Sequence, residues 1–340
     1  MEVLTMKRFL LLWAALALLA ACGKTPARDT IPTLILDTDI GSSTDDLFAL
    51  EMAWRYQQEG RCRVLGVVVD REGEACAACA DVMNTYSGHG EVPLGLVRDG
   101  IKNPAVYVNY QPLPTLTGAD GTPLFQRTVR DYSALPDGWQ LYRKLLASQP
   151  DGSVSIVSIG FLTCLAQLLE SAPDQYAPLS GPELVRKKVK RLYLMGGSFE
   201  QSGILDYNIC QGLPFAQTFF RLWPASVEIM FSPGEVGQGI NYTPDQVLAH
   251  YRNAGVHPIR QVYQTYGSDE GQRMWDPLPL IQAVEGDRLF TLSPAGTVSL
   301  SAQGETLFSP SPGGNARYQK PGTAAWNAAM LERIGPSGRP

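Results

Sequence analysis

Short apolar runs rich in leucine or β-branched residues recur along the chain and alternate with longer segments of helical spacing. The runs cover residues 33–36, 64–69, 92–97, 154–159, 192–195 and 227–231, and helical spacing is clearest over 45–59 and 162–170. Continuous apolar strands separated by helices are typical of a parallel sheet that is covered on both faces. We therefore expect an α/β fold with an open, mostly parallel or mixed sheet flanked by helices in a single domain.

The N-terminal segment has a different pattern. Two basic residues precede an apolar run over residues 9–19, which is too short for a membrane-spanning helix of about 20 residues but suits a signal peptide. The run ends in Leu19-Ala20-Ala21-Cys22, which resembles a bacterial lipobox, the motif whose cysteine is acylated and becomes the new N-terminus. An ordinary signal peptide with an incidental cysteine is the alternative.

This pattern predicts the domain organisation and the location of the protein. Residues 1–21 are expected to be a lipoprotein signal peptide, residues 22–31 the lipidated Cys22 and a polar tether, and residues 32–340 one domain. The protein is then extracytoplasmic, on the periplasmic side of a bacterial outer or inner membrane or on the cell surface. It would contact the membrane only through its lipid anchor.

Composition narrows the class of protein. The 340 residues are 44% hydrophobic and 18% charged, as in an ordinary globular chain. Lys and Arg number 28 against 33 Asp and Glu, so the basic excess that binding to nucleic acid requires is missing. Six cysteines are too few for a disulfide scaffold. A catalytic or ligand-binding domain for a small molecule remains, and a homo-oligomer is compatible with the sequence.

Four carboxylates lie close together where the first predicted strand passes into the first predicted helix. Asp45 and Asp46 would fall in the first turn of that helix, where its dipole favours negative charge. Asp37 and Asp39, at the strand end, have no such explanation. Four carboxylates within ten residues repel one another unless a cation or proton intervenes. With no His or Cys nearby, a hard cation such as Ca²⁺ or Mg²⁺ fits the segment.

The same segment resembles the opening motif of the inosine-uridine-preferring nucleoside hydrolase family. That motif is a strand ending in Asp-x-Asp, then Gly, then Asp-Asp at a helix start. This chain has Asp37-Thr38-Asp39-Ile40-Gly41 followed by Asp45-Asp46. A Mg²⁺ phosphatase can also begin with Asp-x-Asp, but it requires a catalytic lysine and a phosphate-binding Ser or Thr at strand ends, which we do not find.

Three further blocks resemble this family in the family's order, so that the resemblance covers roughly residues 33–290. They are Ser158-Ile159-Gly160-Phe161-Leu162-Thr163-Cys164-Leu165-Ala166, then Leu194-Met195-Gly196-Gly197-Ser198 with Asp206-Tyr207-Asn208, and last Trp275-Asp276-Pro277. A family member would adopt the nucleoside hydrolase fold. It would hydrolyse the N-glycosidic bond of a ribonucleoside or related N-riboside in a calcium-dependent reaction that gives free base and ribose.

The resemblance also implies a role for each matched residue. Asp39 would be both a Ca²⁺ ligand and the general base, and Asp46, the Thr163 carbonyl and Asp276 would be further Ca²⁺ ligands. Asp45, Asn208 and Asp206 would bind the 2′, 3′ and 5′ positions of ribose, respectively. Asp37 would support these ligands from behind. A non-catalytic lipoprotein that binds nucleoside or ribose with the same metal site is the alternative function.

The departures from the family concentrate where the nucleobase should bind. The usual Gly-Asn after the second core strand is replaced near Val69-Asp70-Arg71, and Trp275 stands where many members have a histidine that could protonate the base. Cys164 replaces an Asn, and Asp206 a longer Glu. The group that activates the leaving base is therefore unassigned, and the substrate need not be a common nucleoside.

Three other features have no predicted chemistry. The histidines, His89, His250 and His257, lie outside every matched block. Cys76 and Cys79 form a CxxC pair within an alanine-rich helical stretch over residues 75–83, for which redox or zinc chemistry is the alternative to packing. The Pro-rich segment 103–123 is expected to be an irregular loop bordering the pocket.

Overall fold

The computed structural model describes residues 31–102, 109–266 and 270–336, and residues 32–340 form one compact unit. The predicted signal peptide, Cys22 and most of the tether lie outside the described residues. Within the described residues, no helix is both long and apolar enough to cross a membrane.

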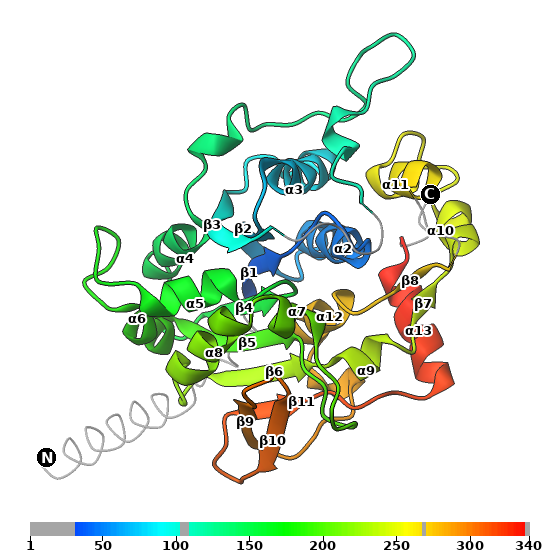
Figure 1. Cartoon of the computed structure of the whole chain (residues 1–340). Helices are drawn as coiled ribbons and strands as arrows, with labels where there is room; N and C mark the ends of the chain where they lie inside the picture. Colours follow the sequence, from blue (N-terminus) through cyan, green and yellow to red (C-terminus); the bar gives the residue numbers. More distant parts are fainter. Residues whose placement is uncertain (1–30, 103–108, 267–269, 337–340) are drawn as a thin grey trace, which may run out of the picture. The chain divides into compact units, whose positions relative to one another are not determined.

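A nine-stranded sheet with the order β10-β9-β11-β6-β5-β4-β1-β2-β3 forms the centre of the domain (Figure 1). The strands are β1 (Thr33–Thr38), β2 (Arg63–Arg71), β3 (Leu94–Ile101), β4 (Val154–Ser158), β5 (Val189–Met195), β6 (Glu228–Ser232), β9 (Gly296–Leu300), β10 (Thr306–Pro310) and β11 (Ala316–Tyr318). β9 runs in the direction opposite to the other eight strands of this sheet. The predicted mostly parallel sheet is confirmed, and its six strands β1 to β6 correspond to the six apolar runs.

Helices cover both faces of this sheet, because successive side chains of each strand point to opposite sides. Leu34 and Leu36 of β1 join a core with α2 (Asp45–Gln58), α3 (Glu74–Tyr86) and α12 (Pro277–Glu285). Ile35 joins a second core on the other face. That core includes α4 (Gly138–Ala147), α5 (Thr163–Glu170), α6 (Gly181–Lys188) and α8 (Leu213–Leu222).

The remaining elements lie around this sandwich. They are α7 (Tyr207–Gln211), α9 (Gly234–Gly237), α10 (Pro244–His250), α11 (Pro258–Tyr266), α13 (Ala324–Ile334) and a small two-stranded sheet of β7 (Asn241–Tyr242) with β8 (Gln272–Arg273). Among them, α7, α9 and β8 approach the carboxyl ends of the central strands and contribute residues there.

The strand order reverses at β1, which lies between β2 and β4. The chain runs outward from β1 through β2 to β3 and then returns to β4 on the other side. Such a switch point opens a crevice beyond the carboxyl ends of the strands, where α/β proteins bind ligands. The segments just beyond β1 and β4 are packed tightly against each other, since a Cβ atom at Gly160 would lie only 2.5 Å from the Asp39 amide nitrogen.

Candidate active site

A cavity of about 340 Å³ lies at this switch point. Its floor comes from residues at or just beyond the ends of four parallel strands: Asp39 after β1, Ile159 after β4, Gly197 after β5 and Gly234 after β6. Of the residues predicted to form the site, Asp39, Asp45, Asp206, Asn208 and Asp276 line this cavity. The structure thus brings together side chains that are up to 237 residues apart in the sequence.

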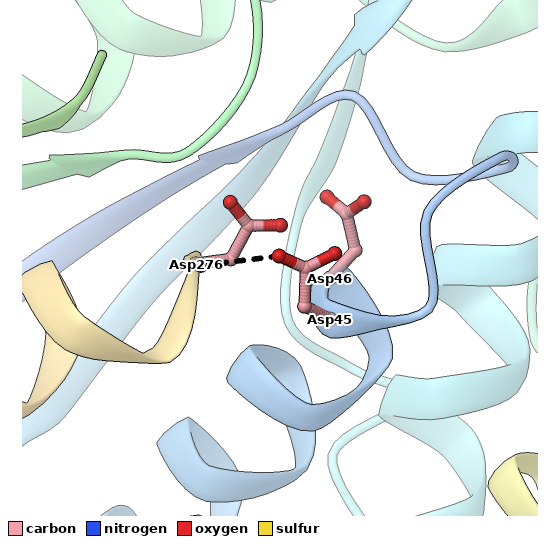
Figure 2. A group of neighbouring side chains, drawn as sticks. All are labelled: Asp45, Asp46 and Asp276. Carbon is pink, nitrogen blue, oxygen red and sulfur yellow. Dashed lines mark hydrogen bonds between the residues drawn. The ribbon is translucent and has the colours of Figure 1, made fainter. Parts of the chain in front are cut away.

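Three carboxylates, those of Asp45, Asp46 and Asp276, form a compact group (Figure 2), and two of these residues, Asp45 and Asp276, line the cavity. Asp45 and Asp46 begin α2, and Asp276 directly precedes α12. One oxygen atom from each of the three lies within 4.8 Å of the others, so that a single ion could bind all three. All three side chains are buried.

Hydrogen bonds to Asp45 hold the two helix starts together. Its Oδ2 accepts from the backbone N–H groups of Trp275 at 3.1 Å and Asp276 at 3.3 Å. Its Oδ1 accepts from the Gln272 amide at 3.2 Å and from the Ser43 hydroxyl. The structure therefore places Asp45 within the acidic group as well as on the cavity wall, whereas the family pattern predicts for it only a contact with the ribose 2′-hydroxyl.

Asp46 contains an oxygen atom that nothing in the described structure satisfies. Its Oδ1 accepts a hydrogen bond from the Thr38 hydroxyl, but its Oδ2 is buried and has no partner among the described residues. A buried polar atom of this kind is costly unless a ligand or ion contacts it. The Asp46 carboxylate belongs to the same group as those of Asp45 and Asp276, between which a cation could lie.

Electrostatics also favour a cation at this group. Burial raises the pKa of Asp45 to about 6. It raises the pKa values of Asp46 and Asp276 well above the ordinary range, and the negative charges of the neighbouring aspartates raise them further. Without a counter-ion these carboxyls would keep protons; a divalent ion would stabilise the charged forms instead. The donor set, made of oxygen atoms alone, fits a hard divalent cation.

Asp39 is held by a buried arginine that sequence analysis did not assign to the site. The Nη2 of Arg71 lies 2.8 Å from Asp39 Oδ2 and 2.9 Å from the Ser42 hydroxyl, and its Nε donates to the Asp39 carbonyl at 2.7 Å. Burial raises the pKa of Asp39, and the Arg71 charge opposes this shift. The sequence showed only that an asparagine is missing at this position, and not that a guanidinium would face Asp39.

Asp206 and Asn208 lie at the start of α7 and line the cavity. Asp206 caps this helix by accepting from the Ile209 N–H at 3.1 Å, and burial raises its pKa to about 7. The Asn208 amide contacts the Ile159 carbonyl at 3.4 Å and the Met195 sulfur at 3.3 Å. The Asn208 side chain is thus fixed against the ends of β4 and β5, while Asp206 also accepts from the Gly197 N–H just beyond β5.

Asp37 and Thr163 lie away from the cavity surface. Asp37 is fully buried in β1, and the Tyr142 hydroxyl donates to it at 2.8 Å. Thr163 is the first residue of α5 and is also fully buried. Neither residue lines the cavity. Asp37 therefore lies behind the other carboxylates, and only the backbone carbonyl of Thr163 could serve as a ligand of an ion.

Comparison with known proteins agrees with this geometry. The family model for inosine-uridine preferring nucleoside hydrolases matches residues 34–325. The chain belongs to this family. It is therefore an N-ribosyl hydrolase, a glycosidase whose family acts on nucleosides and depends on a metal ion. No curated protein matches the sequence.

Solved structures of nucleoside hydrolases share the fold of this enzyme. A plant nucleoside hydrolase is 18% identical with a TM-score of 0.65, over 90% of this chain and 99% of that one. A purine-preferring ribonucleoside hydrolase from Gardnerella vaginalis is 17% identical with a TM-score of 0.64, over 89% and 98%. An inosine-uridine preferring nucleoside hydrolase from Bacillus anthracis is 17% identical with a TM-score of 0.62, over 89% and 99%.

Apolar side chains line the hydrolase cavity as well as carboxylates. Ile204 and Leu205, which are 47% and 51% exposed, belong to its lining together with Trp275, Glu235 and Gln238. Among the described residues that line the cavity there is no lysine, arginine or histidine.

The three histidines lie outside the cavity lining of the hydrolase. His89 stacks on Trp54 with the ring centroids 4.8 Å apart, His250 contacts Tyr242, and His257 lies 3.5 Å from Glu51. This agrees with their position outside the matched sequence blocks. None of the three is therefore placed to protonate a leaving base.

The CxxC pair belongs to the packing of α3 in the hydrolase. Cys76 and Cys79 are both buried, and burial raises the pKa of both thiols, that of Cys76 to about 12. Redox and zinc chemistry need the thiolate, which this environment disfavours.

Part of the Pro-rich segment, residues 103–108, lies outside the described residues. In the described part, the Tyr110 hydroxyl accepts from the Gly41 N–H and donates to the Ser43 carbonyl, so that it holds the loop between Asp39 and Asp45.

Proposed function

We propose that this hydrolase cleaves the N-glycosidic bond of a ribonucleoside or related N-riboside in a calcium-dependent reaction that gives free base and ribose. The observation that carries the proposal is the buried Asp46 carboxylate, which has one oxygen without a partner among the described residues and lies in one group with Asp45 and Asp276, two residues that line the same cavity as Asp39. Family membership supports the reaction class.

Calcium is the proposed ion because the acidic group offers oxygen ligands alone. Asp46 and Asp276 would bind it directly, and Asp39 with the Thr163 carbonyl would complete the protein ligands. Ca²⁺ takes six to eight oxygen ligands in flexible geometry, so that a water molecule and ribose hydroxyls can share it with the protein. Bound there, it would orient the water and the sugar and partly neutralise the buried carboxylates.

The protein side chains then have distinct tasks. Asp39 would accept the proton of the attacking water, since calcium acidifies water too weakly to remove the need for a base. Asp45, Asn208 and Asp206 would bind the 2′, 3′ and 5′ positions of the ribose, and Asp37 would support Asp39 from behind. The concentration of negative charge would stabilise the oxocarbenium-like ribosyl group as the bond to the base breaks.

We also propose that the enzyme works outside the cytoplasm, attached to a bacterial membrane by acylated Cys22. The support is the lipobox-like sequence that ends at Cys22 and the tether that follows it, ahead of the compact unit from Pro32. In this location the substrates would be nucleosides or ribosides that reach the cell from outside.

The function is tested by incubating the purified full chain in detergent with a panel of nucleosides and assaying reducing sugar. We expect ribose release that stops in a chelator and returns when Ca²⁺ is added. Release that is insensitive to chelation contradicts the metal requirement. Tight nucleoside binding without any ribose release contradicts the enzymatic function and favours a binding protein.

A further inference from the structure

One reactive group of the hydrolase is still unassigned, namely the donor that protonates the leaving base. A neutral nucleobase leaves as an anion unless it receives a proton as the C1′–N bond breaks. Many family members have a histidine that could serve where this chain has Trp275. The Trp275 indole N–H is donated to the Gly234 carbonyl at 2.8 Å. The donor would therefore be another side chain of the cavity lining.

Two carboxyl groups of the lining lie outside the group of Asp45, Asp46 and Asp276, and both accept hydrogen bonds from the backbone. Glu235 Oε1 accepts from two N–H groups at 2.7 and 3.0 Å, and Asp206 accepts from three. Such bonds favour the charged form of a carboxyl, which has no proton to give. Burial nevertheless raises the pKa of Asp206 to about 7. Asp206 is therefore the alternative donor that an experiment has to separate.

Tyr207 has a hydroxyl group whose hydrogen has no acceptor. The residue begins α7 and lines the cavity beside Asp206 and Asn208. Its hydroxyl oxygen is buried and has no hydrogen-bond partner among the described residues. A buried hydroxyl of this kind is costly unless a ligand contacts it. A ring nitrogen of a bound base would be such a partner.

Arg71 links this hydroxyl to the proposed general base. Its guanidinium bonds to the Asp39 carboxylate at 2.8 Å and also interacts with the Tyr207 hydroxyl. The Phe161 ring packs against both, with its centroid 5.1 Å from the guanidinium carbon and 6.1 Å from the centroid of the Tyr207 ring. A guanidinium has donors only, so it leaves the hydroxyl hydrogen free, and its charge attracts the phenolate that remains once this hydrogen is transferred.

We propose that Tyr207 is the general acid of this hydrolase and that its hydroxyl donates a proton to a ring nitrogen of the leaving base. The inference rests on the proposed function and adds a catalytic residue to that same site. The C1′–N bond breaks with its electron pair going to the base, which takes the Tyr207 proton and leaves as a neutral molecule. The hydroxyl part of water bonds to C1′, and the other proton of water passes to Asp39. Proton exchange with solvent then restores both side chains.

Substrates that differ in their leaving group test this proposal on the full chain in detergent with Ca²⁺. Nucleosides such as inosine and uridine release a base that needs a proton, whereas nitrophenyl riboside releases a stable phenolate that needs none. Tyr207→Phe keeps the ring and removes the hydroxyl. It should lower kcat/KM at least about a hundredfold for the nucleosides that the wild type cleaves, and less than about threefold for nitrophenyl riboside.

The outcomes separate this inference from the proposed function. Retained hydrolysis of nitrophenyl riboside by Tyr207→Phe shows that the variant is folded and that its metal and ribose sites still work. An equal loss on both kinds of substrate, or no loss on either, overturns the role of Tyr207 while the proposed function stands. If the wild type cleaves no nucleoside, the proposed function itself fails, and the inference fails with it.

Two further variants show which side chain supplies the proton. Asp206→Asn should lower kcat/KM to the same extent for both kinds of substrate, because we propose that Asp206 binds the ribose, which they share. A selective loss on nucleosides in Asp206→Asn, with none in Tyr207→Phe, would assign the acid to Asp206 and overturn the inference. Tyr176→Phe removes the hydroxyl of an exposed tyrosine outside the cavity lining and should change neither value.

Discussion

The guanidinium of Arg71 bonds to both ends of Asp39, with Nε 2.7 Å from the backbone carbonyl and Nη2 2.8 Å from the carboxylate. This pair joins the end of β2 to the loop after β1 at the point where the strand order reverses. Because both side chains are buried, the pair fixes the orientation of the carboxylate that we propose as the general base.

Replacing Arg71 should therefore affect both stability and catalysis. Arg71→Gln leaves a buried carboxylate without its partner and should cost about 3–5 kcal/mol of the free energy of unfolding, with kcat lowered at least about tenfold. Denaturant unfolding and ribose release measure the two effects. Arg143→Gln is the control, since Arg143 is equally buried and pairs with Asp174 far from the cavity. A loss of kcat in both variants alike would show that Arg71 acts only through stability.

Removal of one carboxylate from the acidic group should abolish the response to calcium. Saturating Ca²⁺ should raise the Tm of the wild-type protein by about 5 °C, because the ion binds only the folded site. Asp46→Asn keeps the shape of the side chain but weakens the ligand, and its Tm should not respond. Asp151→Asn, at an exposed position, is the control and should respond as the wild type does. A calcium response in Asp46→Asn would place the ion elsewhere.

Burial of Asp206 predicts a pH dependence of stability. Burial raises its pKa from 3.8 to about 7, so the folded protein holds a proton that the unfolded chain has released between these values. The free energy of unfolding should therefore fall as pH rises from about 4 to 7 and then level off, with a contribution on the order of 4 kcal/mol at most.

Asp206→Asn keeps the helix cap and should remove this contribution, which urea unfolding at pH 5 and pH 8 in saturating Ca²⁺ would show. Asp131→Asn is the matched control, because Asp131 also caps a short helix but is exposed, and hydrogen bonds from Ser133 lower its pKa. The interpretation fails if the slope of stability against pH is the same in Asp206→Asn as in the wild type.

The lipid anchor is testable without any assay of activity. Cys22→Ser removes the thiol that would be acylated, and the protein should move from the membrane fraction to the soluble fraction and lose labelling by a radioactive fatty acid. Replacement of a cysteine within the domain, such as Cys210→Ser, should change neither result. Membrane fractionation of wild-type protein without lipid labelling would contradict the lipobox interpretation.

The central sheet and its strand ends could be predicted because their signals are local. Each of the six strands β1 to β6 is an apolar run, because a parallel strand that is buried on both faces needs apolar side chains on both. The strands β9, β10 and β11 were missed, since side chains such as Thr297 and Leu307 are exposed and their sequences mix polar and apolar residues as loops do. Their place in the sheet depends on tertiary contacts, since only β11 pairs with β6, and β9 and β10 follow it outward.

The site was predicted less completely than the fold for a related reason. The aspartates could be found because the family spacing identifies them one by one. Arg71 and Gln272 belong to no motif of the family. Their contacts to Asp39 and Asp45 join parts of the chain that come together only in the folded protein. Likewise, the placement of Asp45 beside Asp276 depends on N–H groups of a segment 230 residues later in the sequence.

The central claim, hydrolysis of an N-riboside with Asp39 as the base, is tested most directly by comparing ribose release by the wild type and Asp39→Asn at saturating substrate in Ca²⁺. We expect turnover by the wild type and a kcat at least about a hundredfold lower in the variant, with substrate binding still measurable by calorimetry. Equal rates in the two proteins, or binding without ribose release by the wild type, would contradict it.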